Sequence, residues 1–471
     1  MIENMPKNND PCRKIYSNRT LNLRSIRAVG YDMDYTLVHY HVKKWEALAF
    51  HFLKKRLLAL NWPVSDANFL DEFGMRGLVI DQKLGNIVKA NRFGYVKKAM
   101  HGSHTLEFEA LKAAYNQDFI DLNDRRWNFV NTFFSLSELC MFAHAVDALD
   151  SGKFPNNISY DEIAHTIRRE LDAAHLAGDM KRVIEADPSQ YVDLDPNAAQ
   201  MLIDQRGSGK KIMLITNSDW TFTHAMMSFA YDRFMPHHQN WTDLFDLIVV
   251  SARKPAFFTQ EAPIYEVSPK DYTLKPTTCI HDGHKIYEGG NANLVEDYLG
   301  FAGDAILYAG DHVFSDVNIS KAVRRWRTCL ILRELEAEIE IQQQNQDAQK
   351  QLRCLMEELI QLDDRIAHQR LAIQRDRLAH GNDAERLKHQ HAELRKQAEE
   401  LELTITPKAI AQTHLYNENW GLLMRTGNDK SLMARQMEQH ADIYTSRVSN
   451  FLWATPYAYL RSSRGSLPHD E

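Results

Sequence analysis

The sequence contains few cysteines and no apolar stretch long enough to cross a membrane. Its 5 cysteines are odd in number and widely spaced along 471 residues, which favours reduced thiols over a disulfide framework. Residues 1–14 contain no apolar run of signal-peptide length. No other run approaches the roughly 18 to 20 apolar residues of a membrane helix. We therefore expect a cytoplasmic protein without a membrane segment.

An excess of positive charge is also missing. The formal net charge is −7 at pH 7, which argues against nonspecific binding to nucleic acid. What the chain does have is length and apolar content: 471 residues, 44% of them hydrophobic, can form two or three domains around a large core.

One short motif stands out near the N-terminus. A mostly apolar run at residues 26–29, which includes Arg27, leads into the string D-M-D-Y-T, which begins at Asp32. Residues two apart on a strand face the same side, so Asp32 and Asp34 can face one site. Two carboxylates this close repel each other unless a cation lies between them, and Mg²⁺ with oxygen ligands is the most plausible choice. A lone D-x-D is common in turns, but D-x-D-x-T after an apolar strand is more specific.

Three further apolar stretches end in polar residues. Residues 211–215 precede Thr216 and Asn217, residues 247–250 precede Lys254, and residues 305–308 precede Asp311 and Asp316. Open α/β sheets bind ligands at the carboxyl ends of their strands. A single Asp after a strand is more often a helix N-cap than a ligand. Four sites of suitable type in this order instead favour a catalytic constellation.

The residue types suit cleavage of a phosphate monoester. Asp32 would be the nucleophile and would form an aspartyl-phosphate. Asp34 would protonate the leaving ester oxygen and then accept a proton from the attacking water. Thr216 and Asn217 would hold phosphoryl oxygens. Lys254 would neutralise the developing charge.

The same motifs supply ligands for a metal ion. Mg²⁺ would be held by Asp32, by the backbone carbonyl of Asp34 and by Asp311. Asp316 is either a further ligand, acting through water, or an orienting residue.

The motifs resemble those of the haloacid dehalogenase (HAD) superfamily. The strings D-M-D-Y-T-L, T-N-S-D, A-R-K-P-x-F-F and Y-x-G-D-H-x-F-x-D are together similar to the cytosolic purine 5′-nucleotidase family. The resemblance covers nearly the whole chain. It implies an α/β fold, with a HAD-like Rossmannoid parallel-sheet core, an inserted and mainly helical cap, and a long helical hairpin.

The spacing of the motifs suggests the domain boundaries. Far more chain separates the first two motifs than one crossover needs. We therefore assign residues 1–99 and 200–332 to the core and residues 100–199 to a cap that recognises the substrate. Within this cap, Ser135 and Glu138 have the spacing of a capping box.

Residues 333–405 differ from the rest in composition. They are rich in Glu, Gln, Arg and Leu, with apolar residues at three-four spacing on both sides of Gly381. This pattern predicts two long antiparallel helices, an arm for subunit contacts or regulation. Its histidines are interpreted as solvated or seam residues and not as metal ligands. Residues 406–471 are expected to pack on the core or at an oligomer interface.

Five residues of the cap match the substrate-binding set that the resemblance implies. Arg168, Asp172 and His175 share one helical face, a pattern that is often only a solvated surface. Phe134 would stack on a base, and Lys181 would reach the ribose or phosphate. Arg168 can donate to O6 and N7 of a purine, and Asp172 can accept from N1 or N2 hydrogens. These chemistries predict a preference for IMP and GMP over AMP.

Members of the family are typically tetramers that purine nucleotides activate, so the resemblance implies a homo-oligomer with a regulatory GTP or ATP. Effector contacts would fall on Asn131, Phe314 and Arg327, although Ala322 stands where relatives place a basic residue. Local hydrogen bonding by Asn131 and core packing by Phe314 is the alternative.

The predicted function is a Mg²⁺-dependent 5′-nucleotidase, which could also transfer phosphate to a nucleoside. One alternative is a HAD phosphomonoesterase of another substrate class. Another is a nucleotide-sensing scaffold without turnover, against which the complete set of motif residues argues.

Overall fold

The computed structural model describes residues 10–154, 157–236, 239–463 and 465. The expectation that residues 1–14 contain no signal peptide therefore concerns residues that lie largely outside the described ones. The end of the predicted segment 406–471 also lies outside them. None of the helices in the described ranges is both long and apolar enough to cross a bilayer. All of the cysteines carry free thiols, and three of them are buried.

A ten-stranded sheet forms the core of the described chain, and seven neighbouring strands in it are parallel. In spatial order the strands are β1 (Tyr16–Ser17), β20 (Ile443–Thr445), β17 (Arg327–Ile331), β16 (Ile306–Gly310), β3 (Ala28–Tyr31), β11 (Lys211–Ile215), β12 (Leu247–Val250), β15 (Ile286–Gly289), β13 (Ile264–Val267) and β14 (Leu274–Thr277). Strands β1, β13 and β14 are antiparallel to their neighbours at the two edges. The predicted α/β fold with a parallel-sheet core is confirmed.

Both faces of this sheet are covered by helices, which explains why its strands are almost wholly apolar. Val29 and Tyr31 belong to one apolar cluster, whereas Ala28 belongs to a second cluster on the opposite face. Helices α6 (Pro196–Gly207) and α7 (Trp220–Tyr231) pack into the first cluster. Helices α8 (Ala256–Thr259), α9 (Ala292–Leu299) and α10 (Ile319–Arg324) border the second. With both faces covered, the carboxyl ends of the strands are where an open α/β sheet of this kind binds ligands.

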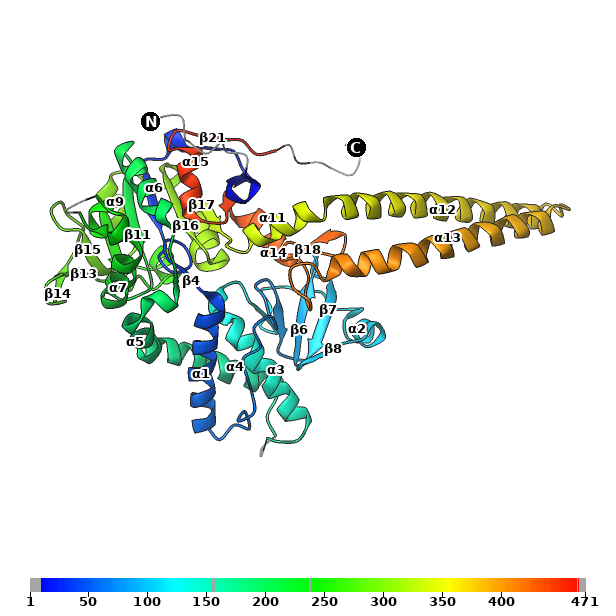
Figure 1. Ribbon diagram of the computed structural model, residues 1–471, viewed down its shortest axis with the longest axis horizontal. Helices are drawn as coiled ribbons and strands as arrows, with labels where there is room; N and C mark the ends of the chain where they lie inside the picture. The colour runs from blue at the N-terminus through cyan, green and yellow to red at the C-terminus, as the bar shows by residue number, and fades with distance from the viewer. Residues whose placement is uncertain (1–9, 155–156, 237–238, 464, 466–471) are drawn as a thin grey trace.

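The part that joins the first and second motifs contains a separate antiparallel sheet. Its order is β8 (His104–Thr105), β7 (Val96–His101), β6 (Asn86–Ala90), β5 (Val79–Asp81) and β9 (Trp127–Phe129). Helices α1 (Val42–Ala59), α3 (Leu136–Asp150) and α4 (Tyr160–Leu176) pack against one another beside it (Figure 1). Two shorter helices, α2 (Phe108–Tyr115) and α5 (Asp179–Ala186), complete this part.

The inserted part is mainly helical, as predicted, but it also contains the short strands of this second sheet. The arrangement corrects one boundary of the sequence prediction. Residues 79–99 were assigned to the core, yet strands β5, β6 and most of β7 lie in the second sheet. The reason is the polar turn before Asn86, where Gly85 has a φ of +70° and allows two apolar strands to fold back on each other.

The capping box falls at a different place from the predicted one. Ser135 precedes α3 but its side chain does not cap that helix. Glu138 instead accepts hydrogen bonds from Arg168 and Asn128. A capping box does form at the start of α4, between Ser159 and Glu162. Glu138 therefore binds side chains from other parts of the chain and does not form the local cap that its spacing predicts.

Two long helices extend away from the rest of the molecule (Figure 1). Helix α11 (Leu335–Gln344) leads into α12 (Gln346–Leu378), and α13 (Ala384–Thr413) returns antiparallel to it. The second long helix passes the predicted limit at residue 405 and contains Pro407. Buried residues in the two long helices are confined to Leu362, Ala398 and Ile405, so most of the arm is exposed.

The chain after the arm returns to the core. Helices α14 (Leu432–His440) and α15 (Phe451–Ala454) pack into the first apolar cluster. Three small two-stranded sheets pair β10 (Val192–Asp193) with β4 (His39–Tyr40), β18 (Arg425–Thr426) with β19 (Asp429–Lys430), and β2 (Leu21–Asn22) with β21 (Tyr459–Leu460). Segments far apart in sequence therefore support one another.

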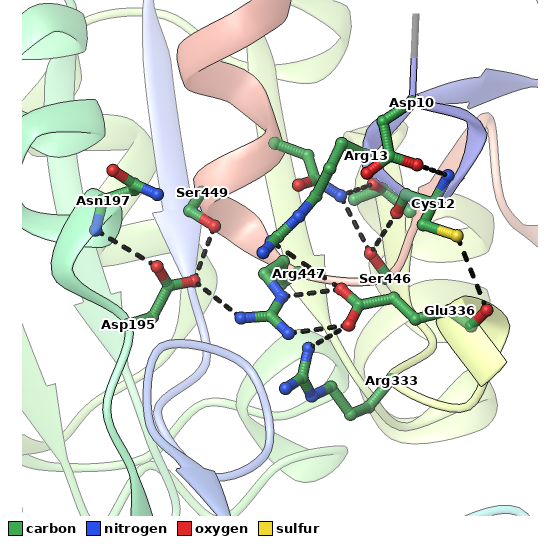
Figure 2. A network of polar contacts seen from close by, with 12 residues as sticks. Asp10, Cys12, Arg13, Asp195, Asn197, Arg333, Glu336, Ser446, Arg447 and Ser449 are labelled. Atoms are coloured by element: carbon green, nitrogen blue, oxygen red, sulfur yellow. Dashed lines mark hydrogen bonds and ion pairs between the residues drawn. The ribbon is translucent and has the colours of Figure 1, made fainter. Parts of the chain in front are cut away.

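A network of arginines and acids fastens α11 to the core (Figure 2). Glu336 accepts hydrogen bonds from Nε and Nη2 of Arg447, at 2.6 and 2.7 Å, and from Nη1 of Arg333 at 2.7 Å. Arg447 also lies 3.6 Å from Asp195, just before α6, and Asp195 accepts from Ser449 at 2.5 Å. Bidentate contacts of this kind fix orientation as well as charge.

Candidate active site

The four motifs meet at one edge of the parallel sheet. Strands β16, β3, β11 and β12 are adjacent, and each runs in the same direction. Asp32 follows β3, Thr216 follows β11 and Asp311 follows β16, while Lys254 lies on the loop after β12. Parallel strands end at the same edge, so the fold brings these side chains together.

Lys254 is the centre of the cluster. Its Nζ lies 2.8 Å from Oδ1 of Asp32 and 2.9 Å from Oδ1 of Asp316, and it donates to the Tyr308 hydroxyl at 3.0 Å. Burial by itself lowers the pKa of Lys254. The nearby carboxylates of Asp316 and Asp32 have the larger effect, and they raise this pKa well above its ordinary value. The lysine therefore carries a positive charge that cancels part of the acid charge.

The remaining acid charge is concentrated in a small space. Carboxylate oxygens of Asp32, Asp311 and Asp316 all lie within 4.8 Å of one another. Burial raises the pKa of Asp32 to about 7 although Lys254 opposes the shift, and burial likewise raises the pKa of Asp311. Within the described chain, Oδ2 of Asp311 accepts no hydrogen bond, whereas Oδ1 of Asp316 faces the ammonium of Lys254. A buried oxygen without a donor, in an all-carboxylate set, fits a hard divalent cation such as Mg²⁺.

Asp34 occupies a different environment. Its Oδ1 accepts a hydrogen bond from the Tyr40 hydroxyl at 2.6 Å, and its Oδ2 accepts one from Ser218 at 2.8 Å. Burial raises the pKa of Asp34, and these two hydrogen bonds oppose the rise. Sequence reasoning missed both donors. Ser218 could have been found, because it lies in the same string as Thr216, but Tyr40 carried no signal.

Asn217 makes a contact that differs from the predicted one. Its Oδ1 accepts from the backbone N–H of Lys254 at 2.6 Å, and its Nδ2 donates to the carbonyl of the same residue at 3.1 Å. It therefore braces the lysine loop. Thr216 is fully buried beside it, and its hydroxyl oxygen accepts from the N–H of Ser218 at 3.1 Å.

Arg76 is a second buried cation that sequence reasoning missed. Its guanidinium forms a two-pronged contact with Glu334 and donates to the backbone carbonyl of Asp311 at 3.2 Å. The same group lies 4.2 Å from the ring centre of Phe133. A lone arginine outside any motif gives no sequence signal of this role.

Four of the five predicted substrate residues lie near one another: Arg168 donates to Ser135, next to Phe134, and the Phe134 ring is 4.9 Å from that of Tyr35, next to Asp34. The rings of Phe134 and His175 are 5.7 Å apart. Arg168 contacts Asp172 at 3.4 Å and Glu138 at 2.9 Å. Burial lowers the pKa of His175 to about 4, so the ring is neutral, and its Nε2 has no partner among the described residues.

Lys181, the fifth substrate residue, lies beside the second motif. Its Nζ is 2.8 Å from Oδ2 of Asp219 and 4.9 Å from the ring centre of Phe222.

The predicted effector residues are only partly brought together. Asn131 and Phe314 line one pocket of about 440 Å³, and Arg168 lies in its wall. The Oδ1 of Asn131 is buried without a described donor. Arg327 does not line this pocket: it contacts Asp442 at 2.9 Å and belongs to a separate cluster of charges. The reason is its place at the start of β17, whereas Phe314 follows the end of β16.

Comparison with known proteins decides the family. A model described as the 5′ nucleotidase family matches residues 15–471. The chain belongs to the 5′ nucleotidase family. It is also similar to a 5′-nucleotidase domain-containing protein of Dictyostelium discoideum, at 26% identity, over 98% of this chain and 75% of that protein.

Solved structures resemble the chain only distantly. An archaeal β-phosphoglucomutase of Pyrococcus sp. strain ST 04 aligns with 65% of this chain and 87% of its own, at 9% identity and a TM-score of 0.30. The HAD-hydrolase YfnB of Bacillus subtilis, described as bound to magnesium, aligns with 65% and 88% at 15% identity and a TM-score of 0.24. Family membership makes this 5′ nucleotidase family protein a phosphoric monoester hydrolase that acts on nucleotides.

The contact between Arg76 and Glu334 gives a first prediction. Arg76→Lys keeps the charge but loses the two-pronged contact, so we expect the free energy of unfolding to fall by about 2 kcal/mol and the phosphatase rate to fall with it. Urea unfolding followed by tryptophan fluorescence measures the first, and phosphate release the second. Arg386→Lys on the exposed arm is the matched control. Equal values for both variants and the unaltered protein would contradict the role of Arg76.

Proposed function

We propose that the protein is a Mg²⁺-dependent 5′-nucleotidase that hydrolyses IMP and GMP through an aspartyl-phosphate on Asp32. The observation that carries the proposal is the contact of one buried lysine with both Asp32 and Asp316, beside an oxygen of Asp311 that lacks a donor among the described residues. A phosphate monoester is doubly anionic, so a carboxylate nucleophile can approach it only where charge is compensated. Lys254 supplies part of that compensation.

In the proposed first step, an oxygen of Asp32 attacks the phosphorus and the bond to the ester oxygen breaks. The leaving oxygen takes the proton of Asp34, whose raised pKa favours the protonated form needed at this point. In the second step, water attacks the phosphorus, Asp34 accepts its proton, and Asp32 is released with inorganic phosphate. A nucleoside hydroxyl in place of water would give phosphotransfer.

Three carboxylates would hold the metal ion: Asp32, Asp311 and Asp316, with the backbone carbonyl of Asp34 as a further ligand. Bound Mg²⁺ would neutralise phosphate charge and orient the reacting group. Around it, Asn217 fixes the loop of Lys254, and Thr216 and Asn217 would donate to phosphoryl oxygens.

The arrangement above the acids supports a purine substrate. Phe134 offers its ring beside the neutral His175, and Arg168 is held by Glu138 and Asp172 with other guanidinium hydrogens left for a base. We propose that Arg168 and Asp172 recognise O6, N7 and N1 of hypoxanthine or guanine, and that Lys181 approaches the ribose or phosphate. Adenine lacks the matching N1 hydrogen.

Regulation by GTP or ATP is part of the same proposal. The pocket of Asn131 and Phe314 is its site, because a buried unpaired oxygen there can accept a hydrogen bond from a ligand. Phe314 is two residues before Asp316, so a ligand in this pocket would act on the loop that carries the acids. Arg327 is left out of this site.

We also propose a cytoplasmic homo-oligomer, with the arm as a subunit contact. Large apolar side chains along the arm are exposed, among them Leu378 at 73% and Leu403 at 76%, which supports a partner surface there.

The substrate assignment is tested by phosphate release from IMP, GMP, AMP, UMP and glucose 6-phosphate with Mg²⁺. We expect fast turnover of IMP and GMP, at least about tenfold slower turnover of the other three, and no measurable turnover by Asp32→Asn. Equal rates on all substrates would overturn the roles of Phe134 and Arg168 alone. Undiminished turnover by Asp32→Asn would overturn the nucleophile.

The environment of Asp34 gives a second test. Ser218→Ala removes one of the two hydroxyl donors to Asp34, and we expect kcat for IMP to fall about tenfold or more while KM changes little. Ser228→Ala, whose hydroxyl contacts His224 on the surface of α7, is the control. A kcat equal to that of the control would show that the contact with Ser218 is dispensable.

The effector pocket is tested by the ratio of the IMP hydrolysis rate with GTP to the rate without it. In Asn131→Ala this ratio should fall towards one, because the ligand loses its acceptor. The exposed Asn382→Ala should keep the ratio of the unaltered protein. Full activation of Asn131→Ala would place the effector elsewhere.

A further inference from the structure

A second pocket lies at the opposite ends of the strands that carry the catalytic motifs. It has a volume of about 530 Å³ and is bordered by the start of β3 and the start of β11. Arg27 directly precedes β3, and Asp32 directly follows it. Lys211 begins β11, and Thr216 follows it. The four residues of β3 separate the two sites by about 13 Å of strand, so this pocket is distinct from the candidate active site.

The pocket is strongly basic although the whole chain is acidic. Arg24, Arg27, Lys210 and Lys211 line it, and Asp282 is the acid among its lining residues, in a chain of net charge −7. Cations gathered in a concave surface focus their field on an anion.

Two of these four cations, Arg24 and Arg27, have no acid partner among the described residues and are not fully engaged. Arg24 donates from Nε to the Tyr457 carbonyl at 3.0 Å, and no described acid forms an ion pair with Arg24 or Arg27. Lys210 is buried and donates to two backbone carbonyls, of Leu23 and Ile26, both at 2.6 Å. Lys211 does pair with Asp246, at 3.2 Å. The two arginines are therefore the groups available to an incoming anion.

Aromatic rings stand beside the cations. The guanidinium of Arg27 lies 4.0 Å from the ring centre of Phe301, which holds it against the wall of the pocket. Tyr298 and Tyr457 also line the pocket, and the Tyr457 side chain is about half exposed. A guanidinium fixed in this way loses less conformational freedom when it binds phosphate. An ordinary solvated basic edge would need neither the hollow nor the aromatic wall.

We propose that this pocket binds a nucleoside di- or triphosphate, with its phosphates on Arg24 and Arg27 and its base on the aromatic wall. Guanidinium groups bind phosphate oxygens through paired hydrogen bonds, and aromatic side chains stack on bases of any kind. The site is independent of the proposed catalytic mechanism and of the pocket that Asn131 lines.

The test uses the full chain and ATP as the probe, in buffer with EDTA. Titration calorimetry is carried out on Asn131→Ala protein, so that binding at the other pocket is weakened. In this background we expect Arg24→Gln with Arg27→Gln to raise the Kd for ATP at least about tenfold. The control is Arg386→Gln with Arg395→Gln, which removes the same charge from the exposed arm and should leave the Kd unchanged.

Each outcome decides between the alternatives. An unchanged Kd in the Arg24 and Arg27 variant would overturn the site, provided that thermal unfolding shows an intact fold. An equal loss of ATP affinity in the arm control would also overturn the site, because such a loss would show that binding depends on net charge alone. Tripolyphosphate is titrated alongside: weaker binding than ATP, with Tyr298→Leu weakening ATP alone, supports the nucleotide. Equal Kd values for ATP and tripolyphosphate, both unaffected by Tyr298→Leu, would overturn the assignment of a nucleotide as the ligand.

Discussion

The buried acids at the end of the parallel sheet impose the strongest constraint on this structure. Asp32, Asp311 and Asp316 hold oxygens within 4.8 Å of one another, away from bulk water. Like charges in such a place repel strongly and must be compensated. Two buried cations do so: Lys254 contacts Asp32 and Asp316, and Arg76 lies against Asp311. Each cation in turn needs support, which Asn217 gives to the lysine loop and Glu334 to the arginine.

That need for support connects distant parts of the chain. Glu334 lies one residue before α11, the helix from which the arm begins. Glu336 on the same helix binds Arg447 of the C-terminal segment, and Glu338 accepts from the backbone N–H groups of Leu423 and Met424. Glu334, Glu336 and Glu338 are thus two residues apart along the chain. They contact, in turn, Arg76 beside the site, Arg447 of the C-terminal segment, and the chain that follows the arm. The base of the arm is therefore part of the framework that holds the charged cluster.

Local sequence was enough to predict the parts of the fold and site that depend on local chemistry. Each catalytic string follows an apolar strand, so its position at the sheet edge follows from strand direction alone. Contacts between distant segments could not be predicted in this way. Arg76 and Glu334 are 258 positions apart, and neither lies in a motif. Local spacing predicts that Glu138 caps a helix, but Arg168, 30 residues later, binds it. The second sheet was missed because its short strands are interrupted by polar turns.

The arm adds a mechanical property to this framework. The 33 residues of α12 extend over about 50 Å at the usual rise of an α-helix, and α13 stiffens it along its length. Asn345 alone separates this rod from α11. The arm is thus a lever whose short end lies beside Glu334. A tilt of about 5° at that end displaces the tip by about 4 Å, given the same helix rise. Because α11 is itself fastened to Arg447 and follows Glu334 directly, the base of the arm is the point where a load on the tip would reach the framework around Arg76.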